Sequence, residues 1–299
     1  RCRFQKITAS SLNEDFKLNL LYCSSPLKNT DRRKIDHMMK KRYFAIPILA
    51  IALHFLLSNL LYFLVERLVL DVFHIPPQQF MKYSYWGEIL IYAVLILVFF
   101  TLYKLLWRKE VSELHTMTNF KDVLGSLVVG FGICGISGLW IMLAEQLPSL
   151  QKSVEAMNAG AENIAGGNAF GTFMIAVIAA PVVEEILFRG IVLRSMRKFS
   201  PAWAAILMSS VLFGVYHLNI VQAAYATLMG IAAGILYEKK RNLLFPILVH
   251  FANNLITMLQ GFAPSEVNEL ISIFILIMIA PAGYVVCRSL RQGKRADSM

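Results

Sequence analysis

The sequence predicts an all-α, polytopic transmembrane helical bundle of about eight spans, with both termini in the cytoplasm. The first observation is composition: 57% of the 299 residues are hydrophobic and 16% are charged, whereas soluble domains have about 25% charged residues. The second is a series of long apolar windows, and the third is the placement of Lys and Arg between them. The apolar runs are continuous and do not alternate with polar residues, which excludes a membrane β-barrel.

Eight apolar windows approach the roughly 20 residues that a helix needs to cross a bilayer. In chain order they are 43–65, 88–107, 123–144, 170–193, 202–218, 220–237, 243–260 and 270–287. The fifth and sixth windows are short and meet at about Asn219, so the sequence is compatible with seven or eight spans.

The basic residues predict the orientation of these spans. If the KKR stretch at 40–42 is cytoplasmic, alternating the loops leaves only Arg67, Lys82 and Lys152 on the opposite side. The positive-inside rule therefore places both termini in the cytoplasm. It also accounts for most of the net charge of +10, so no nucleic-acid partner is expected, and the basic flanks suit anionic lipid headgroups.

The chain divides into a polar segment, 1–37, and one membrane-embedded domain, 38–299. Residues 1–37 are aperiodic and lack an initiating Met, whereas Met38 and Met39 precede a basic and then apolar run. We expect 1–37 to be translated upstream sequence, with a disordered cytosolic tail as the alternative. The polar stretch 145–169 is rich in Gly, Asn and Ala, which predicts a mobile outer connection. Short loops and the absence of a retention signal favour a bacterial plasma membrane.

Several common catalytic signatures are missing. The cysteines, at 2, 23, 134 and 287, are scattered and suggest neither a thiolate metal site nor a disulfide framework. GxSxG and HExxH stretches are also absent. His54 and Asn59 have no carboxylate nearby in the sequence, so we interpret them as packing or interfacial groups.

One apolar window contains three ionisable residues in the stretch PVVEEILFRG: Glu184, Glu185 and Arg189. A charge at the centre of a membrane helix costs roughly 2.5–3.5 kcal/mol or more. Glu185 and Arg189 are four residues apart, so on a helix they share a face and can compensate each other. Glu184 points elsewhere and needs a partner on another helix, water or a proton. It is therefore the candidate general base, while a purely structural salt bridge is the alternative.

Two further windows carry polar residues of the same kind. Phe213 and His217 share one helical face, and His250 and Asn254 share another, with Asn253 one position away. A lone histidine in a membrane helix is usually a hydrogen-bonding residue between helices. Three helices that each present such groups instead predict one enclosed polar site.

At these positions the sequence resembles the CPBP family, the CaaX-protease and bacteriocin-processing intramembrane proteases also called Abi proteins. EEILFR at 184–189, FGVYH at 213–217 and HFANN at 250–254 match the family's EExxxR, FxxxH and HxxxN motifs. The resemblance covers about 170–260, which we define as the protease-like core. It implies a helical bundle whose cavity cleaves peptide bonds near the membrane.

The residues and the resemblance lead to one mechanistic hypothesis. Glu184, with His217 orienting it or sharing the water, would act as the general base in peptide hydrolysis. His250 and Asn254 would donate hydrogen bonds to the developing oxyanion, and the buried ion pair would hold the helix.

The cofactor and the substrate stay open at this point. Two histidines and a glutamate could bind a divalent metal such as Zn²⁺, but Asn254 is a poor zinc ligand and a good oxyanion donor, which favours metal-independent catalysis. The substrate could be a prenylated C-terminus, a bacteriocin precursor or another membrane-associated protein. A non-catalytic bacteriocin-immunity or scaffold protein is the main alternative, and a proton-coupled transporter is a weaker one because no repeated halves with interrupted helices are visible.

Overall fold

The computed structural model describes four stretches of the chain: 29–74, 76–108, 118–165 and 168–296. Every regular element in these stretches is helical, which confirms the all-α prediction. Most of the segment 1–37 lies outside the described residues, so its origin stays a prediction. The first described helix begins at Asn29, inside that segment.

Each of the eight apolar windows lies on a helix. In chain order the helices are α2 (Asn29–Arg67), α3 (Pro77–Leu106), α5 (Phe120–Glu145), α6 (Gln151–Ala165), a continuous helical run from Ala169 to Met196, α10 (Ala202–Tyr216), α11 (Ile220–Lys240), α12 (Leu244–Phe262) and α13 (Ser265–Ala296). A short π-helix, η1 (Leu68–Val72), extends α2. The run from Ala169 consists of α7 (Ala169–Thr172), η2 (Phe173–Ala179), α8 (Ala180–Glu185), η3 (Ile186–Leu193) and α9 (Arg194–Met196), of which η2 and η3 are π-helical.

Five of the described helices are long and apolar enough to cross a membrane. They contain the stretches Arg42–Asp71, Ser84–Leu106, Phe120–Glu145, Ile220–Lys240 and Ser265–Arg291. Helix α10 has 15 residues, which rise only about 22 Å against a hydrocarbon thickness of roughly 30 Å. The count of eight spans is therefore not confirmed.

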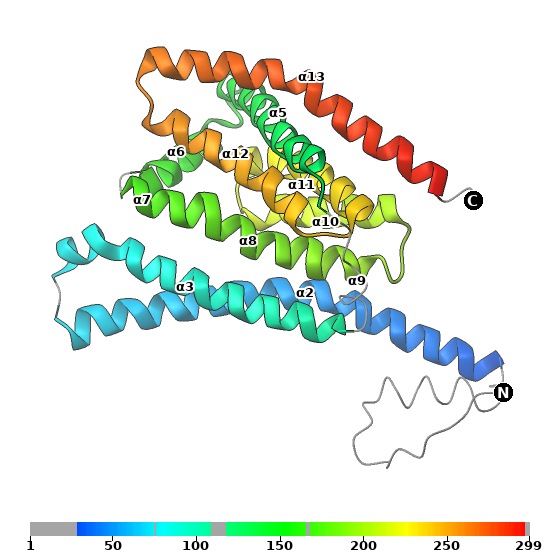
Figure 1. Ribbon diagram of the computed structural model, residues 1–299. Coiled ribbons are helices and arrows are strands. Elements are labelled where there is room, and N and C mark those ends of the chain that lie inside the picture. Colours follow the sequence, from blue (N-terminus) through cyan, green and yellow to red (C-terminus); the bar gives the residue numbers. More distant parts are fainter. Residues whose placement is uncertain (1–28, 75, 109–117, 166–167, 297–299) are drawn as a thin grey trace.

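The two ends of the described chain lie toward the same end of the bundle. Figure 1 shows α2 entering and α13 leaving on one side, with α2 and α3 forming an antiparallel hairpin beside the rest of the bundle. This arrangement is compatible with termini on one side of the membrane. Which side that is stays a prediction.

The expectation of a mobile connection at 145–169 is wrong for the part that forms α6. Val154 packs with Ala144 and Val221 in a small apolar cluster. The Ser153 hydroxyl donates to Asn219 Oδ1 over 2.8 Å, and the Asn219 amide donates back to the Ser153 carbonyl over 2.8 Å. Local Gly and Asn content misled the prediction because these contacts come from residues distant in sequence.

Helix α5 lies between α12 and α13 and fits closely against both. A Cβ atom at Gly130 would overlap the Val249 carbonyl oxygen on α12, and one at Gly132 would overlap Ala282 on α13. Small residues let membrane helices approach backbone to backbone. Gly130 thereby fixes the part of α12 that carries His250.

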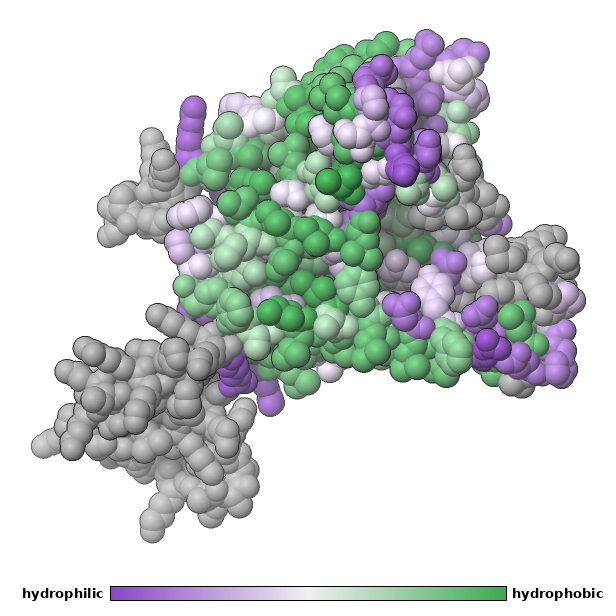
Figure 2. Space-filling view, turned by 180° about the vertical axis from the view of Figure 1, so that it is seen from behind, coloured by the Kyte–Doolittle hydropathy of each residue, from purple (hydrophilic) through white to green (hydrophobic). Residues whose placement is uncertain are grey.

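The outer surface is largely hydrophobic. Large apolar side chains such as Leu56, Leu97 and Trp203 are more than half exposed. Figure 2 shows hydrophobic residues across the middle of one face and hydrophilic residues mainly toward its sides. Contiguous exposed apolar surface of this extent is typical of a lipid-facing protein. Together with the five long apolar helices, it identifies an integral membrane protein.

Candidate active site

The two glutamates and the arginine of EEILFR are buried inside the bundle. Glu185 and Arg189 have relative exposures of 0% and 1%, and Glu184 has 9%. They lie on α8 and η3, in the continuous helical run that Figure 1 shows between the α2–α3 hairpin and the rest of the bundle. Because water is excluded, each charge needs a partner in the protein.

Glu185 joins two helices through one carboxylate oxygen. Arg189 Nη1 donates to Glu185 Oε1 over 2.9 Å, as the four-residue spacing predicted. His250 Nδ1, on α12, lies 3.1 Å from the same oxygen. A carboxylate only accepts hydrogen bonds, so this contact places a proton on His250 Nδ1 and leaves Nε2 as the second functional nitrogen.

Glu184 has no direct ion pair with Arg189 of the kind that Glu185 forms. Its Oε2 atom has no hydrogen-bond partner among the described residues. His250 Nε2 lies 3.9 Å from this oxygen, which is too long for a direct hydrogen bond. The site thus contains two carboxylates, those of Glu184 and Glu185, and one guanidinium, that of Arg189. Glu184 Oε2 is therefore a buried carboxylate oxygen that is left to contact a substrate or water.

Phe213 links the three motifs physically. The Arg189 guanidinium lies over its ring, 4.7 Å from the centroid. The rings of His217 and His250 approach the same phenyl group edge-on, with centroid distances of 4.9 and 5.7 Å. One aromatic ring thus packs against the cation and both histidines, and the cation–π contact further stabilises buried Arg189.

His217 lies at the end of a helix, and its role in orienting Glu184 or sharing the water stays a prediction. It caps the C-terminus of α10, and its Nδ1 atom donates to the Phe213 carbonyl over 2.8 Å, because a carbonyl can only accept. No hydrogen bond or ion pair joins His217 to Glu184, and both residues belong to the described part of the chain. Nε2 of His217 is left to interact with a substrate or water.

Asn254 is held by a carbonyl that the helical run leaves free. Ala180 N–H donates to the carbonyl of Ile175, five residues earlier, which is the π-helical register. In this register the donor to the next carbonyl, that of Ala176, would be the N–H of residue 181. That residue is Pro181, which has no N–H. Asn254 Nδ2 donates to the Ala176 carbonyl over 2.8 Å and so satisfies the orphaned acceptor. An amide nitrogen has two hydrogens, which leaves one for another acceptor.

The α2–α3 hairpin contributes a histidine that sequence reasoning assigned to packing. His54 is 6% exposed, and its Nδ1 lies 3.1 Å from the Tyr216 hydroxyl. Tyr216 precedes His217 in FGVYH and packs against Phe188. The signal in the sequence was a histidine in an apolar window, but nothing there connected it to a tyrosine on another helix.

The donor atoms do not form a clear metal centre. Among the described residues, no group of three or more His, Cys, Asp and Glu side chains has an arrangement that could hold an ion. Glu184 and His250 alone would provide two ligands, fewer than the three protein ligands typical of catalytic zinc sites. We therefore derive no catalytic step through a metal.

Comparison with known proteins identifies the motif-bearing segment. Residues 166–256 match the model of the family described as type II CAAX prenyl endopeptidase Rce1-like. The resemblance to the CPBP family is confirmed over this segment. The "Putative membrane peptidase YdiL" of Bacillus subtilis is 29% identical over 91 residues, which are 30% of this chain and 37% of that protein. No solved structure matches the chain.

Proposed function

We propose that the protein is an intramembrane endopeptidase that hydrolyses peptide bonds of membrane-associated substrates with a water activated by Glu184. The single observation behind this proposal is a buried, unpartnered Glu184 oxygen facing His250 Nε2, inside the segment that matches the CAAX endopeptidase family. A structural salt bridge would need only Glu185 and Arg189. It gives no reason for a second buried carboxylate.

The proposed reaction uses groups that the structure leaves free. Glu184 takes a proton from water, the resulting hydroxide attacks the peptide carbonyl, and the same proton passes to the leaving amine as the C–N bond breaks. The second Nδ2 hydrogen of Asn254 is the candidate donor to the oxyanion, and His250 or His217 would donate from Nε2 only as a doubly protonated ring. Glu185 and Arg189 act as positioning residues because they hold His250 and the helix.

The name of the matched family suggests a prenylated C-terminus as the first substrate to test. The purified full-length chain would be reconstituted in liposomes with a farnesylated CaaX peptide, its unprenylated counterpart and a bacteriocin precursor peptide. We expect mass spectrometry to detect a cleaved product of at least one peptide with the wild type and none with Glu184→Gln. Binding without cleavage by the wild type under all conditions would instead support an immunity or scaffold protein.

The proposal is metal-independent, which a separate measurement tests. Active protein would be analysed by inductively coupled plasma mass spectrometry and assayed after exposure to a chelator. We expect activity without stoichiometric zinc. One zinc per chain, with activity that disappears and returns with the metal, would contradict this part of the proposal. The bacterial plasma membrane stays the predicted location.

A further inference from the structure

A cavity at one end of the bundle is lined by cations from three helices, and it is separate from the candidate active site. Its volume is about 150 Å³, and its charged lining consists of Lys121 and Asp122 from α5, Lys239 and Lys240 from α11, and Arg288 from α13. We call it the cationic end pocket. None of the six candidate site residues lines it.

The pocket lies where three apolar spans end. The span of α5 begins at Phe120, the span of α11 ends at Lys240, and that of α13 ends at Arg291. The ends of three apolar spans near one pocket are what the boundary between hydrocarbon and headgroups would produce. Tyr284 lines the pocket and is 66% exposed, as is common for aromatic residues at a membrane interface.

The charges around the pocket are unbalanced. Four Lys and Arg residues oppose one aspartate in its lining, which gives 4 − 1 = +3. Lys240 Nζ forms an ion pair with Asp122 Oδ2 at a distance of 2.5 Å. Lys239 is repelled by Lys240 and Arg288 and attracted by Asp122.

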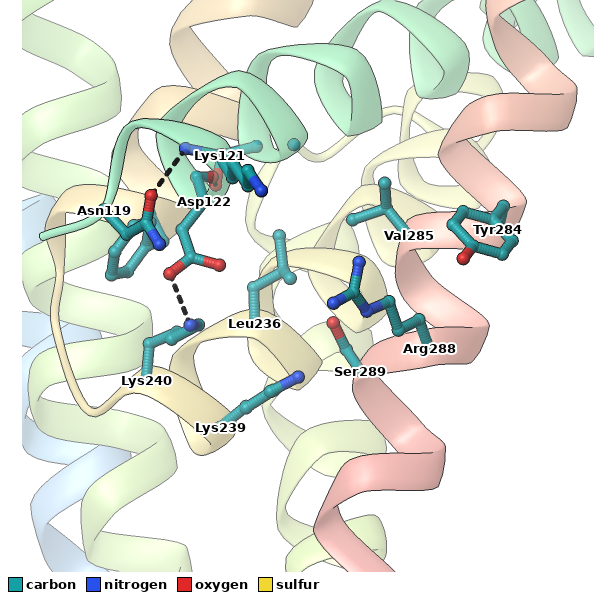
Figure 3. Close-up of a pocket in the computed structure, with 13 residues that line it drawn as sticks. Asn119, Lys121, Asp122, Leu236, Lys239, Lys240, Tyr284, Val285, Arg288 and Ser289 are labelled. Atoms are coloured by element: carbon teal, nitrogen blue, oxygen red, sulfur yellow. Dashed lines mark hydrogen bonds and ion pairs between the residues drawn. The ribbon is translucent and has the colours of Figure 1, made fainter.

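The directions of the side chains agree with this charge distribution. Figure 3 shows Lys239 and Arg288 extending from α11 and α13 into the space between these helices. The pocket also lies beside the N-terminus of α5, where the helix dipole favours an anion. A bound anion would relieve the repulsion between the cations.

We propose that the cationic end pocket binds the phosphate group of an anionic phospholipid. The cavity is smaller than the roughly 300–1,000 Å³ of sites that enclose drug-sized ligands, so a compact group fits best. Its position at headgroup depth favours a lipid over free phosphate, because acyl chains can lie against the adjoining apolar helix faces. Basic pockets between membrane helices are suited to such headgroups. The proposal does not depend on the proposed peptidase activity.

Lipid retention by the delipidated full-length chain tests the proposal. Native mass spectrometry would measure binding of dioleoyl phosphatidylglycerol, dioleoyl phosphatidylcholine and inorganic phosphate. The double variant Lys239→Gln/Arg288→Gln removes two pocket cations. The matched control, Lys104→Gln/Arg108→Gln, removes two exposed cations at the end of α3, outside the pocket.

We expect the wild type to bind phosphatidylglycerol more tightly than phosphatidylcholine. The pocket double variant should bind phosphatidylglycerol about thirtyfold more weakly, since each cation near an anionic surface contributes about 1 kcal/mol and 1.4 kcal/mol is tenfold. The control pair should change binding less than about twofold. If the double variant does not fold, Arg288→Gln alone should weaken binding about fivefold.

Three results would overturn the proposal. Equal losses in the pocket and control pairs would mean a diffuse surface effect, and unchanged binding in the pocket variants would mean that the lipid binds elsewhere. Retention of inorganic phosphate without a preference for phosphatidylglycerol would assign the pocket to free phosphate and contradict the lipid source.

Discussion

The buried charges at the centre of the bundle differ from the charges at its end in how they are compensated. At the centre, Glu185 accepts from both Arg189 and His250, and all three side chains are no more than 4% exposed. At the end pocket, the Asp122–Lys240 pair is about one-quarter to one-third exposed, and several further cations surround it.

This difference shows what each environment permits. Inside the bundle solvent cannot compensate a charge, so buried ionic groups must be balanced by other groups of the protein. A buried carboxylate without a direct ion pair to a cationic side chain, such as Glu184, is therefore a candidate functional group. At the end, water, salt and lipid headgroups can supply the missing countercharge. The same kinds of residue should therefore respond very differently to mutation in the two places.

Glu185→Gln should have the largest effect on stability. It leaves Arg189 and His250 without their shared carboxylate, and breaking a buried ion pair costs roughly 3–5 kcal/mol. Thermal melting in detergent would measure this loss. Glu185→Gln combined with Arg189→Met should recover part of it, because the cost lies mainly in the unpaired cation. Equal melting of the single and double variants would show that the central charges are not coupled.

Gly130→Ala should have the next largest effect, because it tests whether close helix packing supports the central site. The added Cβ overlaps the Val249 carbonyl and lies 2.6 Å from Ala252 Cβ, so α12 must move. Overpacking of this kind costs about 1–3 kcal/mol. Gly138→Ala on the same helix is the matched control, since nothing lies within 4 Å of its added Cβ. Similar melting temperatures for the two variants would contradict the close contact between α5 and α12.

Asn254→Ala should destabilise the protein by about 1 kcal/mol, because it removes one hydrogen bond between membrane helices. The cost should shrink in a Pro181→Ala background, in which residue 181 regains an N–H for the Ala176 carbonyl. Four melting curves, for the wild type, both single variants and the double variant, complete the cycle. If Asn254→Ala costs as much in that background as in the wild type, the interpretation that Pro181 leaves the Ala176 carbonyl without a backbone donor is wrong.

Lys240→Gln should have the smallest effect. Its ion pair with Asp122 is partly exposed, and exposed pairs contribute about 0.2–1 kcal/mol. We expect a small loss of stability at low salt and almost none at about 1 M salt, where the screening length is about 3 Å. A loss of several kcal/mol that salt does not change would mean that the end pocket is as enclosed as the central site.

The sequence was sufficient to predict the helices of the eight apolar windows and one buried ion pair. The eight apolar windows coincide with helices because long apolar runs have few alternatives in a bilayer. The Glu185–Arg189 contact follows from helical spacing alone.

The remaining features depend on contacts between helices. The shared carboxylate of Glu185 and His250, the position of His217 at a helix cap, and the His54–Tyr216 hydrogen bond each join segments far apart in the chain. The α6 helix escaped prediction for the same reason. Pro181 is apparent in the sequence, but which carbonyl it leaves for Asn254 depends on the π-helical register, which the sequence does not reveal.

Substitution of Glu184 by glutamine tests the central claim most directly. The two side chains are nearly isosteric, and Glu184 Oε2 has no hydrogen bond to lose. Cleavage of a prenylated or other accepted peptide and thermal melting would be measured on the same preparation. The account predicts a fall in turnover of at least about 100-fold, the contribution of a general base, with a melting temperature close to that of the wild type. A variant that keeps its turnover, or that melts as early as Glu185→Gln, would contradict the assignment of Glu184 as the catalytic base.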